Sequence, residues 1–400
     1  MTGSQATLMS LLRASVTGGE ASVAADTDWA AVMKESLQQT VFLTALDAAA
    51  PLKEQIPPEV FAGWQKTGRA GLMSNARVNA AQQAMIALLP EGTPYVILKG
   101  EAAAAYYPRP ELRGLGDVDF LIDPARGEAL ERLFREAGYT ESHEAHARHR
   151  VFRKPGAHLE MHYEPAGIPE KAAGERVRAA LAGVLERAVP AAGGMGPFSA
   201  PAPRDHALIL LLHMQHHMLG EGLGLRHLCD WACFVQKTAD EPFWGELTDT
   251  LSSIGLLTYA AVMTATCARY LGTPCPDWAA APEDVCEAVM EDILAGGNFG
   301  RKDADRSRSG MMVSNHGKAG TRHGKWRTMA EVLNASIRED HPVVKKVPVL
   351  YPVFFVWRVL LYGWRVLTGK RPSLRKLAPE AEKRKAVYDQ LHIFEVESGS

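Results

Sequence analysis

Two aspartates one residue apart carry the clearest chemical signal in this chain. Asp117 and Asp119 lie in Gly116-Asp117-Val118-Asp119-Phe120-Leu121-Ile122, whose apolar residues predict a buried strand. Residues i and i+2 of a strand point to the same face, so both carboxylates should project together. Adjacent carboxylates repel unless a positive charge lies between them, and Mg²⁺ prefers carboxylate and phosphate oxygens. The pair predicts a divalent metal site; a solvated strand edge or a turn is the alternative interpretation.

A third acid comes from a later strand. The pattern from His158 to Tyr163 alternates, so that Glu160 shares one strand face with His158 and His162. If this strand lies beside the strand that carries Asp119, Glu160 completes a three-carboxylate site able to hold two metal ions.

Residues suited to phosphate lie close by in sequence. Gly100 lets the backbone approach a ligand closely, and the amides that follow it could cradle an anion. Lys99 and Arg113 are the nearest cations, and arginine can grip phosphate through two hydrogen bonds. Both cations could equally be ordinary surface residues.

These residues require a compact α/β module to position them. The expected order is a strand at Tyr95–Leu98, a short helix from Glu101 to Tyr107, and the strand Asp117–Ile122. A helix capped by Asp123, with Pro124 at its first position, and a hairpin follow. We expect an α+β fold whose small mixed sheet lies between largely helical regions. The expected units are a helical region 1–90, the catalytic module 91–165, a helical domain 166–300, a flexible linker 301–328 and a basic helical region 329–400.

Several short motifs follow in order: Leu98-Lys99-Gly100, Tyr107-Pro108, Arg113, the stretch 116–122 and Gly138-Tyr139. Together they resemble the uncharacterised bacterial nucleotidyltransferase family of the DNA polymerase β-like superfamily. The resemblance covers about residues 94–165 most specifically, and the stretches 222–231, 296–300 and 351–352 also look like longer members. It implies a polymerase β-like sheet.

The resemblance also implies roles for individual residues. Gly100 would stand in the small turn, Asp117 and Asp119 would be metal ligands, and Glu160 would be the third acid. Gly116 belongs to the same nucleotide-binding stretch. One position departs from the pattern: Glu101 stands where much of the superfamily has a small residue contacting the triphosphate. An acid there should repel phosphate unless its side chain points away.

Composition limits the location and the partners. The net charge of -2 argues against long nucleic acid as the partner. The first thirty residues lack the basic start and apolar run of a signal peptide, and the five cysteines form no regular framework. We therefore expect reduced thiols in a cytoplasmic protein.

Two regions remain without an assigned role. His206, His213, His216 and His217 lie on one expected helix, where packing, substrate contact and metal binding are all open. Arg226 and Asp230 are four residues apart, which predicts an intrahelical salt bridge.

From Lys345 to Lys385 the chain has eleven Lys/Arg against two acids around an apolar stretch, Val347 to Leu367. A helix packed on the enzyme and a peripheral membrane contact at the inner face both fit this pattern, whereas Pro348, Pro352, Arg358 and Arg365 argue against a spanning helix.

The sequence therefore predicts a nucleotidyltransferase that uses Mg²⁺ or Mn²⁺ and an NTP, with ATP the expected donor. It would move a nucleoside monophosphate to an acceptor hydroxyl on a small molecule, a sugar or a protein. The alternative is a weakly active or inactive scaffold of the same fold in a membrane-proximal assembly.

Overall fold

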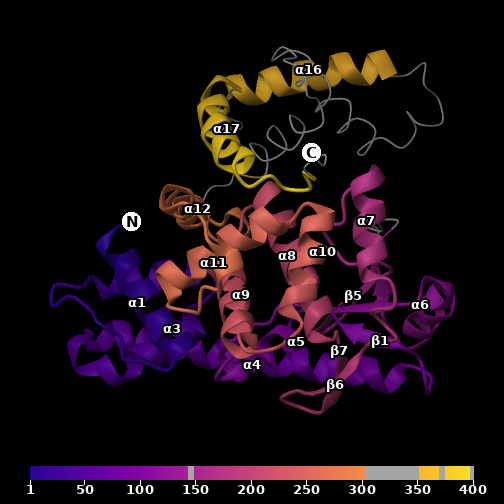
Figure 1. Cartoon of the computed structure of the whole chain (residues 1–400), viewed down its shortest axis with the longest axis horizontal. Helices are drawn as coiled ribbons and strands as arrows, with labels where there is room; N and C mark the ends of the chain where they lie inside the picture. Colours follow the sequence, from indigo (N-terminus) through magenta and orange to yellow (C-terminus); the bar gives the residue numbers. More distant parts are fainter. Residues whose placement is uncertain (143–147, 303–305, 307–350, 369–373, 397–400) are drawn as a thin grey trace.

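The computed structural model describes residues 1–142, 148–302, 306, 351–368 and 374–396. The fold is α+β, as predicted, with a small mixed sheet between helical regions (Figure 1). Most of the expected linker 301–328 lies outside the described residues.

One five-stranded sheet carries the predicted acids. Its order is β1-β2-β5-β4-β3, with β2 and β5 parallel and the other neighbours antiparallel. The strands are β1 (Tyr95–Ile97), β2 (Val118–Ile122), β3 (Thr140–Glu141), β4 (His149–Lys154) and β5 (Ala157–His162). The strands that the sequence predicted to carry Asp119 and Glu160 are thus neighbours, as expected.

The two faces of the sheet pack against different helices. Val118, Phe120 and Ile122 enter a core with α4 and α6 residues such as Met85 and Phe134. The alternate residue Leu121 joins a second core built largely from the later helices. Asp119 lies on the Leu121 side of β2 by strand alternation. The carboxylates therefore face the later helices.

Helices form the layers around this sheet. In Figure 1 the long α4 runs beneath the sheet, and α8 and α9 stand at the centre of the molecule. The N-terminal helices are α1 (Gly3–Thr17), α2 (Trp29–Gln38), α3 (Phe42–Ala49) and α4 (Pro58–Leu88). The module itself contains α5 (Glu101–Ala104) and α6 (Gly127–Glu136). The later helices are α7 (Lys171–Leu181), α8 (Pro203–Leu219), α9 (Leu225–Thr238), α10 (Trp244–Ile254), α11 (Leu257–Leu271) and α12 (Glu283–Gly296).

Two expected helices have different bounds. The helix after Gly100 ends at Ala104 and not at Tyr107. The helix expected from Pro124 starts with a 3₁₀ turn, Pro124–Arg126, before α6 begins at Gly127. A two-stranded hairpin, β6 (Val189–Ala192) and β7 (Pro197–Ala200), interrupts the region expected to be helical. Glycines at 193, 194 and 196 supply its turn, which helical periodicity does not reveal.

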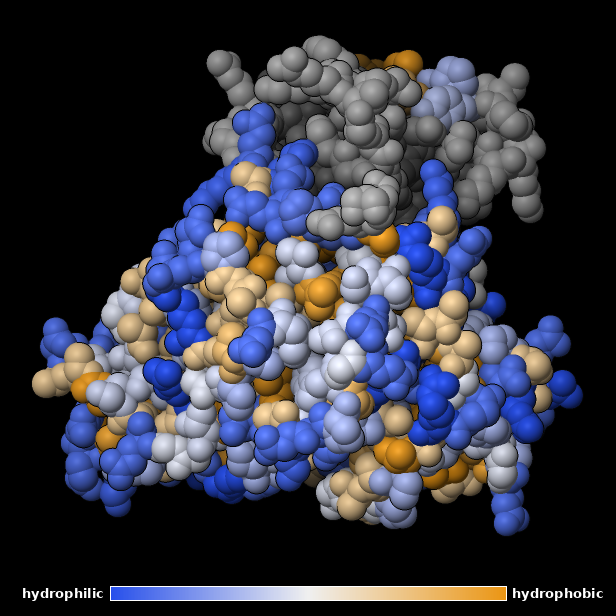
Figure 2. All heavy atoms as spheres, viewed as in Figure 1, coloured by the Kyte–Doolittle hydropathy of each residue, from blue (hydrophilic) through white to orange (hydrophobic). Residues whose placement is uncertain are grey.

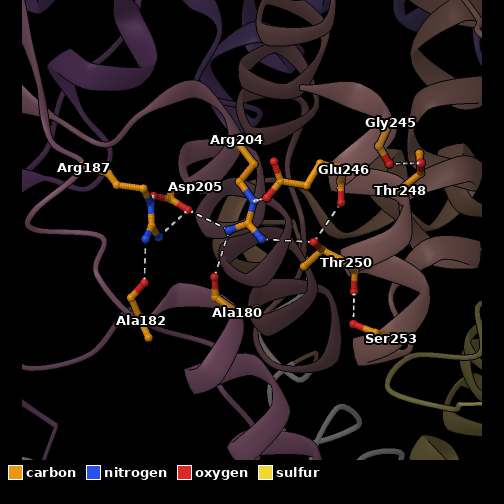
Figure 3. Close-up of polar contacts among 10 residues, drawn as sticks. All are labelled: Ala180, Ala182, Arg187, Arg204, Asp205, Gly245, Glu246, Thr248, Thr250 and Ser253. Carbon is orange, nitrogen blue, oxygen red and sulfur yellow. Dashed lines mark hydrogen bonds and ion pairs between the residues drawn. The ribbon is translucent and has the colours of Figure 1, made fainter. Parts of the chain in front are cut away.

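A buried acid fixes the start of α8, the helix that carries the histidines. Asp205 is fully buried and accepts hydrogen bonds from Arg187 (2.8 and 3.0 Å) and Arg204 (2.9 Å) (Figure 3). Arg204 also donates to the Thr250 hydroxyl of α10 at 3.0 Å and to the Ala180 carbonyl of α7 at 2.9 Å. This network joins three helices, and a buried charge paired in this way avoids most of its desolvation penalty.

The C-terminal region contains α16 (Tyr351–Leu367) and α17 (Leu374–Asp389). Figure 1 shows α17 near α12 and α16 along the outer edge of the molecule. No helix in the described part of the chain is long and apolar enough to span a membrane. Over the body of the molecule, polar and apolar residues are interspersed on the face in Figure 2.

Candidate active site

The parallel pairing of β2 with β5 places Asp119 directly opposite Glu160. Oδ1 of Asp119 lies 2.9 Å from Nζ of Lys99 and 3.0 Å from Nε2 of His162. The same His162 nitrogen is 3.6 Å from Oε2 of Glu160. Asp119 is 2% exposed, so these contacts bury an acid, a lysine and a histidine together. Strand alternation predicts the shared face of Glu160 and His162, but the histidine's contact with Asp119 requires the strand pairing.

Asp117 lies at the edge of this group. It immediately precedes β2, and its side chain is half-buried. Ligand atoms of Asp119, Glu160 and His162 all lie within 4.8 Å of one another. Asp117 is outside that set but close enough for its charge to act on Lys99 and Glu160. The structure thus brings all three predicted acids to one place, with Asp117 on the outer side.

The two aspartates have opposite electrostatic environments. The negative charge of Asp119, followed by burial, raises the pKa of Asp117. Burial alone would raise the pKa of Asp119, but Lys99 and His162 outweigh it and hold that pKa below its usual value. Asp119 is therefore a stable carboxylate with its charge balanced, whereas Asp117 carries negative charge that nothing nearby fully compensates.

The other charged residues of the site also change one another's pKa values, namely Glu160, Lys99 and His162. Burial opposes the ionisation of Glu160, yet the His162 ring, 3.6 Å away, and the charge of Lys99 lower the pKa of Glu160 overall. Burial likewise opposes the charged forms of Lys99 and His162, but the acids raise the pKa of both. Asp119 and Glu160 are therefore stable as carboxylates, in contrast to Asp117.

The donor set fits a hard divalent cation. Asp117, Asp119 and Glu160 offer carboxylate oxygens, which Mg²⁺ and Mn²⁺ prefer. The excess negative charge at Asp117 is the feature that a cation would neutralise. His162 is within reach of the same space, so its imidazole can hold the ligating carboxylates in place.

Glu101, the departure from the superfamily pattern, points away from this group. Its carboxylate accepts hydrogen bonds from the side chain of Gln82 on α4 and from the Gly194 amide at 2.7 Å. Burial raises the pKa of Glu101, and these two hydrogen bonds oppose the rise. Glu101 thereby ties α5 to the β6–β7 turn. Gly100 adopts φ 61° and ψ -118°, a conformation that only glycine takes readily.

The two arginines near the site have different partners from those that the sequence predicts. Arg113, a predicted phosphate ligand, binds Asp230 through two hydrogen bonds of 3.0 and 2.7 Å and donates a third to the Gly114 carbonyl. Tyr107 donates to the same Asp230 at 2.7 Å. The expected salt bridge between Arg226 and Asp230 is wrong, because Arg113 reaches Asp230 with the better two-pronged geometry.

Arg226 is consequently left without a carboxylate partner in the described part of the chain. Its Nε is buried without a hydrogen-bond partner, and its guanidinium lies 5.4 Å from the centre of the Phe299 ring. Burial and the neighbouring Arg113 lower the pKa of Arg226, whereas Asp230 and Asp117 oppose that change. Arg226 is half-buried overall, and a cation without such a partner can accept an anion.

A groove borders the other side of the site. Gly116 and His158 line it together with basic residues of α4 and the β4–β5 hairpin, namely Arg77, Arg153 and Lys154. The exposed Gly116 therefore stands between the acids and a basic surface.

A protein family described as uncharacterised nucleotidyltransferase matches residues 25–272. The chain belongs to this family. Among curated proteins and solved structures, none matches. Membership supports nucleotidyltransferase activity in general, and the matched region includes the acids, Lys99 and Arg226. The nucleotidyltransferase family match also extends through α8 and α9, well beyond the sheet.

The sequence motifs did not reveal the contacts of three residues near the site. His162, Asp230 and Arg226 make their contacts with residues far away in sequence. The local sequence could not show that Arg226 lacks an ion pair. Its helical neighbour Asp230 binds Arg113 instead, which is 117 residues away in the chain.

We predict opposite stability effects for the two aspartates. Asp117→Asn should raise the free energy of unfolding at neutral pH, because it removes a charge that the folded state disfavours. Asp119→Asn should lower that free energy by about 3 kcal/mol, since Lys99 and His162 lose their shared partner in a buried position. Urea unfolding with a chelator present measures both.

The pH dependence supplies a control. The pKa of Asp117 is higher in the folded protein than in the unfolded chain. Such a group stabilises the fold fully when pH is below its unfolded pKa, and this contribution is lost as pH rises through its folded pKa. The advantage of Asp117→Asn should therefore vanish as pH falls below the ordinary aspartate range. A stability loss in both variants at neutral pH would contradict the assigned charge balance.

Proposed function

We propose that this nucleotidyltransferase moves a nucleoside monophosphate from an NTP, ATP first, to an acceptor hydroxyl, with Mg²⁺ or Mn²⁺ as its cofactor. The observation that carries the proposal is the register of β2 against β5, which sets Asp119 beside Glu160 on the side that faces α8 and α9. Asp117, Asp119 and Glu160 would hold the metal.

The bound metal would supply positive charge to the triphosphate and a lowered pKa to the acceptor hydroxyl. The chain's own residues prepare the site for this. Lys99 and His162 keep Asp119 ionised and in position. The lowered pKa of Glu160 makes it a weaker base, so we assign it to metal binding in preference to proton abstraction. Positioning and charge neutralisation then account for most of the catalysis.

Arg226 is the cation that we assign to the triphosphate. Arg113 has its donors engaged by Asp230 and Gly114, whereas Arg226 has a buried Nε without a partner and lies near Asp117. A phosphate oxygen would accept a hydrogen bond from this nitrogen and compensate the charge of the half-buried guanidinium. Arg113 then acts indirectly, by holding α9 against the loop before β2.

The acceptor class stays broad. The basic groove beside Gly116 suits a small molecule, a sugar or a protein segment that carries negative charge. Long nucleic acid is disfavoured by the net charge of -2. Transfer of label from NTP to a protein in a lysate would favour a protein acceptor.

We predict that NTP binding requires both a divalent metal and the acids. Calorimetry should show ATP binding with Mg²⁺ or Mn²⁺, no binding with a chelator, and loss of binding in Asp119→Asn and Glu160→Gln. Glu128→Gln, an exposed acid on α6, is the matched control and should bind as the wild type does. Equal ATP binding with and without metal would rule out the proposed site.

Replacement of Arg226 tests the triphosphate assignment separately. Arg226→Met should weaken metal-dependent ATP binding roughly 10–100-fold, the loss expected for a charge-assisted hydrogen bond. Stability should hold, because no ion pair is broken. Arg132→Met, an exposed arginine on α6, should leave binding unchanged. Unchanged ATP affinity in Arg226→Met would contradict this assignment and leave Lys99 as the cation that binds the triphosphate.

One observation favours the second function, a membrane-proximal scaffold. The helix α16 exposes apolar side chains that recur at helical spacing, among them Val353, Val356, Leu360 and Trp364. Basic residues flank it in the sequence. An exposed apolar stripe with basic flanks is the pattern of a helix that lies on an anionic lipid surface.

Vesicle flotation measures this contact. The full chain should float with phosphatidylserine vesicles and stay behind with neutral phosphatidylcholine vesicles, and a form truncated at Val347 should not float. Val356→Glu/Leu360→Glu should also abolish flotation, whereas Leu72→Glu/Met73→Glu, exposed apolar positions on α4, should not. Failure of the full chain to float would remove the membrane contact.

A further inference from the structure

Three histidines from two helices meet beside the acidic site. His213 and His217 lie one turn apart on α8, and His227 comes from the first turn of α9. Their ring centres are 4.4, 5.2 and 5.1 Å apart, and one nitrogen of each lies within 4.8 Å of the others. We call this trio the histidine cluster.

The cluster presents unprotonated nitrogens. Burial lowers the pKa of all three rings well below the usual histidine value, and neighbouring charges, Lys99 and Arg226 among them, lower it further. The rings are therefore neutral at physiological pH, the form that binds metals. Nδ1 of His213 and Nε2 of His227 are buried and lack hydrogen-bond partners in the described part of the chain.

We propose that the histidine cluster binds a borderline transition-metal ion, Zn²⁺ foremost, in a site separate from the carboxylates. Imidazole suits Zn²⁺, whereas Mg²⁺ prefers oxygen. Zinc–nitrogen bonds of about 2.0–2.1 Å place tetrahedral ligands roughly 3.4 Å apart, so small side-chain rotations would close the set. Binding at Nε2 of His227 moves the ring proton to Nδ1 and ends the long, 3.4 Å hydrogen bond from the Gly224 amide.

Three protein ligands leave one tetrahedral position open. The positive charges of Lys99 and Arg226 act on the cluster, and no carboxylate belongs to the set. This environment favours an anionic oxygen in the fourth position, such as hydroxide or a substrate oxygen. Phe299, whose ring centre is 4.7 Å from that of His217 and 5.5 Å from that of His227, covers one side.

The competing explanation is ring packing alone, in which the histidines and Phe299 simply fill space. Packing needs the ring shapes but no nitrogen lone pairs, so it predicts no metal affinity. The two explanations therefore separate on metal binding by the intact protein.

Zinc calorimetry on the chelator-treated full chain tests the proposal. Wild type should bind Zn²⁺, and His217→Gln, at a partly exposed position, should bind it at least about tenfold more weakly. His216→Gln, the exposed neighbour on α8, is the matched control and should keep wild-type affinity. Asp117→Asn/Asp119→Asn should also keep it, which distinguishes this site from the catalytic one.

Substitution with Co²⁺ gives a second readout. Tetrahedral Co²⁺ on the cluster should produce an intense visible absorption band that disappears in His217→Gln and persists in the double aspartate variant. Absence of Zn²⁺ binding by wild type, unchanged binding by His217→Gln, or loss of the band in the aspartate variant would each overturn the proposal. Failure of ATP binding would leave it standing, because the cluster does not depend on the nucleotide.

Discussion

The burial of like charges is the constraint on which this structure depends. Parallel pairing of β2 with β5 places Asp119 against Glu160, and Asp117 adds a third negative charge at the strand start. Buried carboxylates at close range raise each other's pKa unless cations compensate them. Lys99 and His162 do so for Asp119, but Asp117 remains undercompensated. The site is therefore stable enough to fold and can still accept a further positive charge, which suits the divalent metal that we propose there.

Whether a charged side chain has a partner also separates the other charged residues of the helical layer. Asp205 is satisfied by two arginines and fixes α8, and Arg113 is satisfied by Asp230 and fixes α9. Arg226 is the exception, since its buried Nε has no partner in the described part of the chain. The paired charges hold the helical layer against the sheet, and Arg226 is the cation to which we assign an anionic substrate in our proposal.

Local pattern predicted the strands of the sheet and which acids share a strand face. Alternation in β2 and β5 indicated which side chains share a face, and the turn residues bounded the hairpin. Partner choice was not predictable, because it depends on tertiary contacts. Asp230 prefers the two-pronged grip of Arg113 to the helical neighbour Arg226, and Glu101 finds Gly194 at a separation of 93 residues. His227 joins His213 and His217 only because α8 and α9 pack together.

The most direct test of the central claim is a crystal structure of the protein with Mn²⁺ and a non-hydrolysable ATP analogue, using anomalous scattering to locate the metal. A manganese peak should appear bound by Asp117, Asp119 and Glu160, with a triphosphate oxygen on the same ion and the Arg226 guanidinium on phosphate. A nucleotide bound elsewhere, or no manganese at the three carboxylates while nucleotide is present, would contradict it.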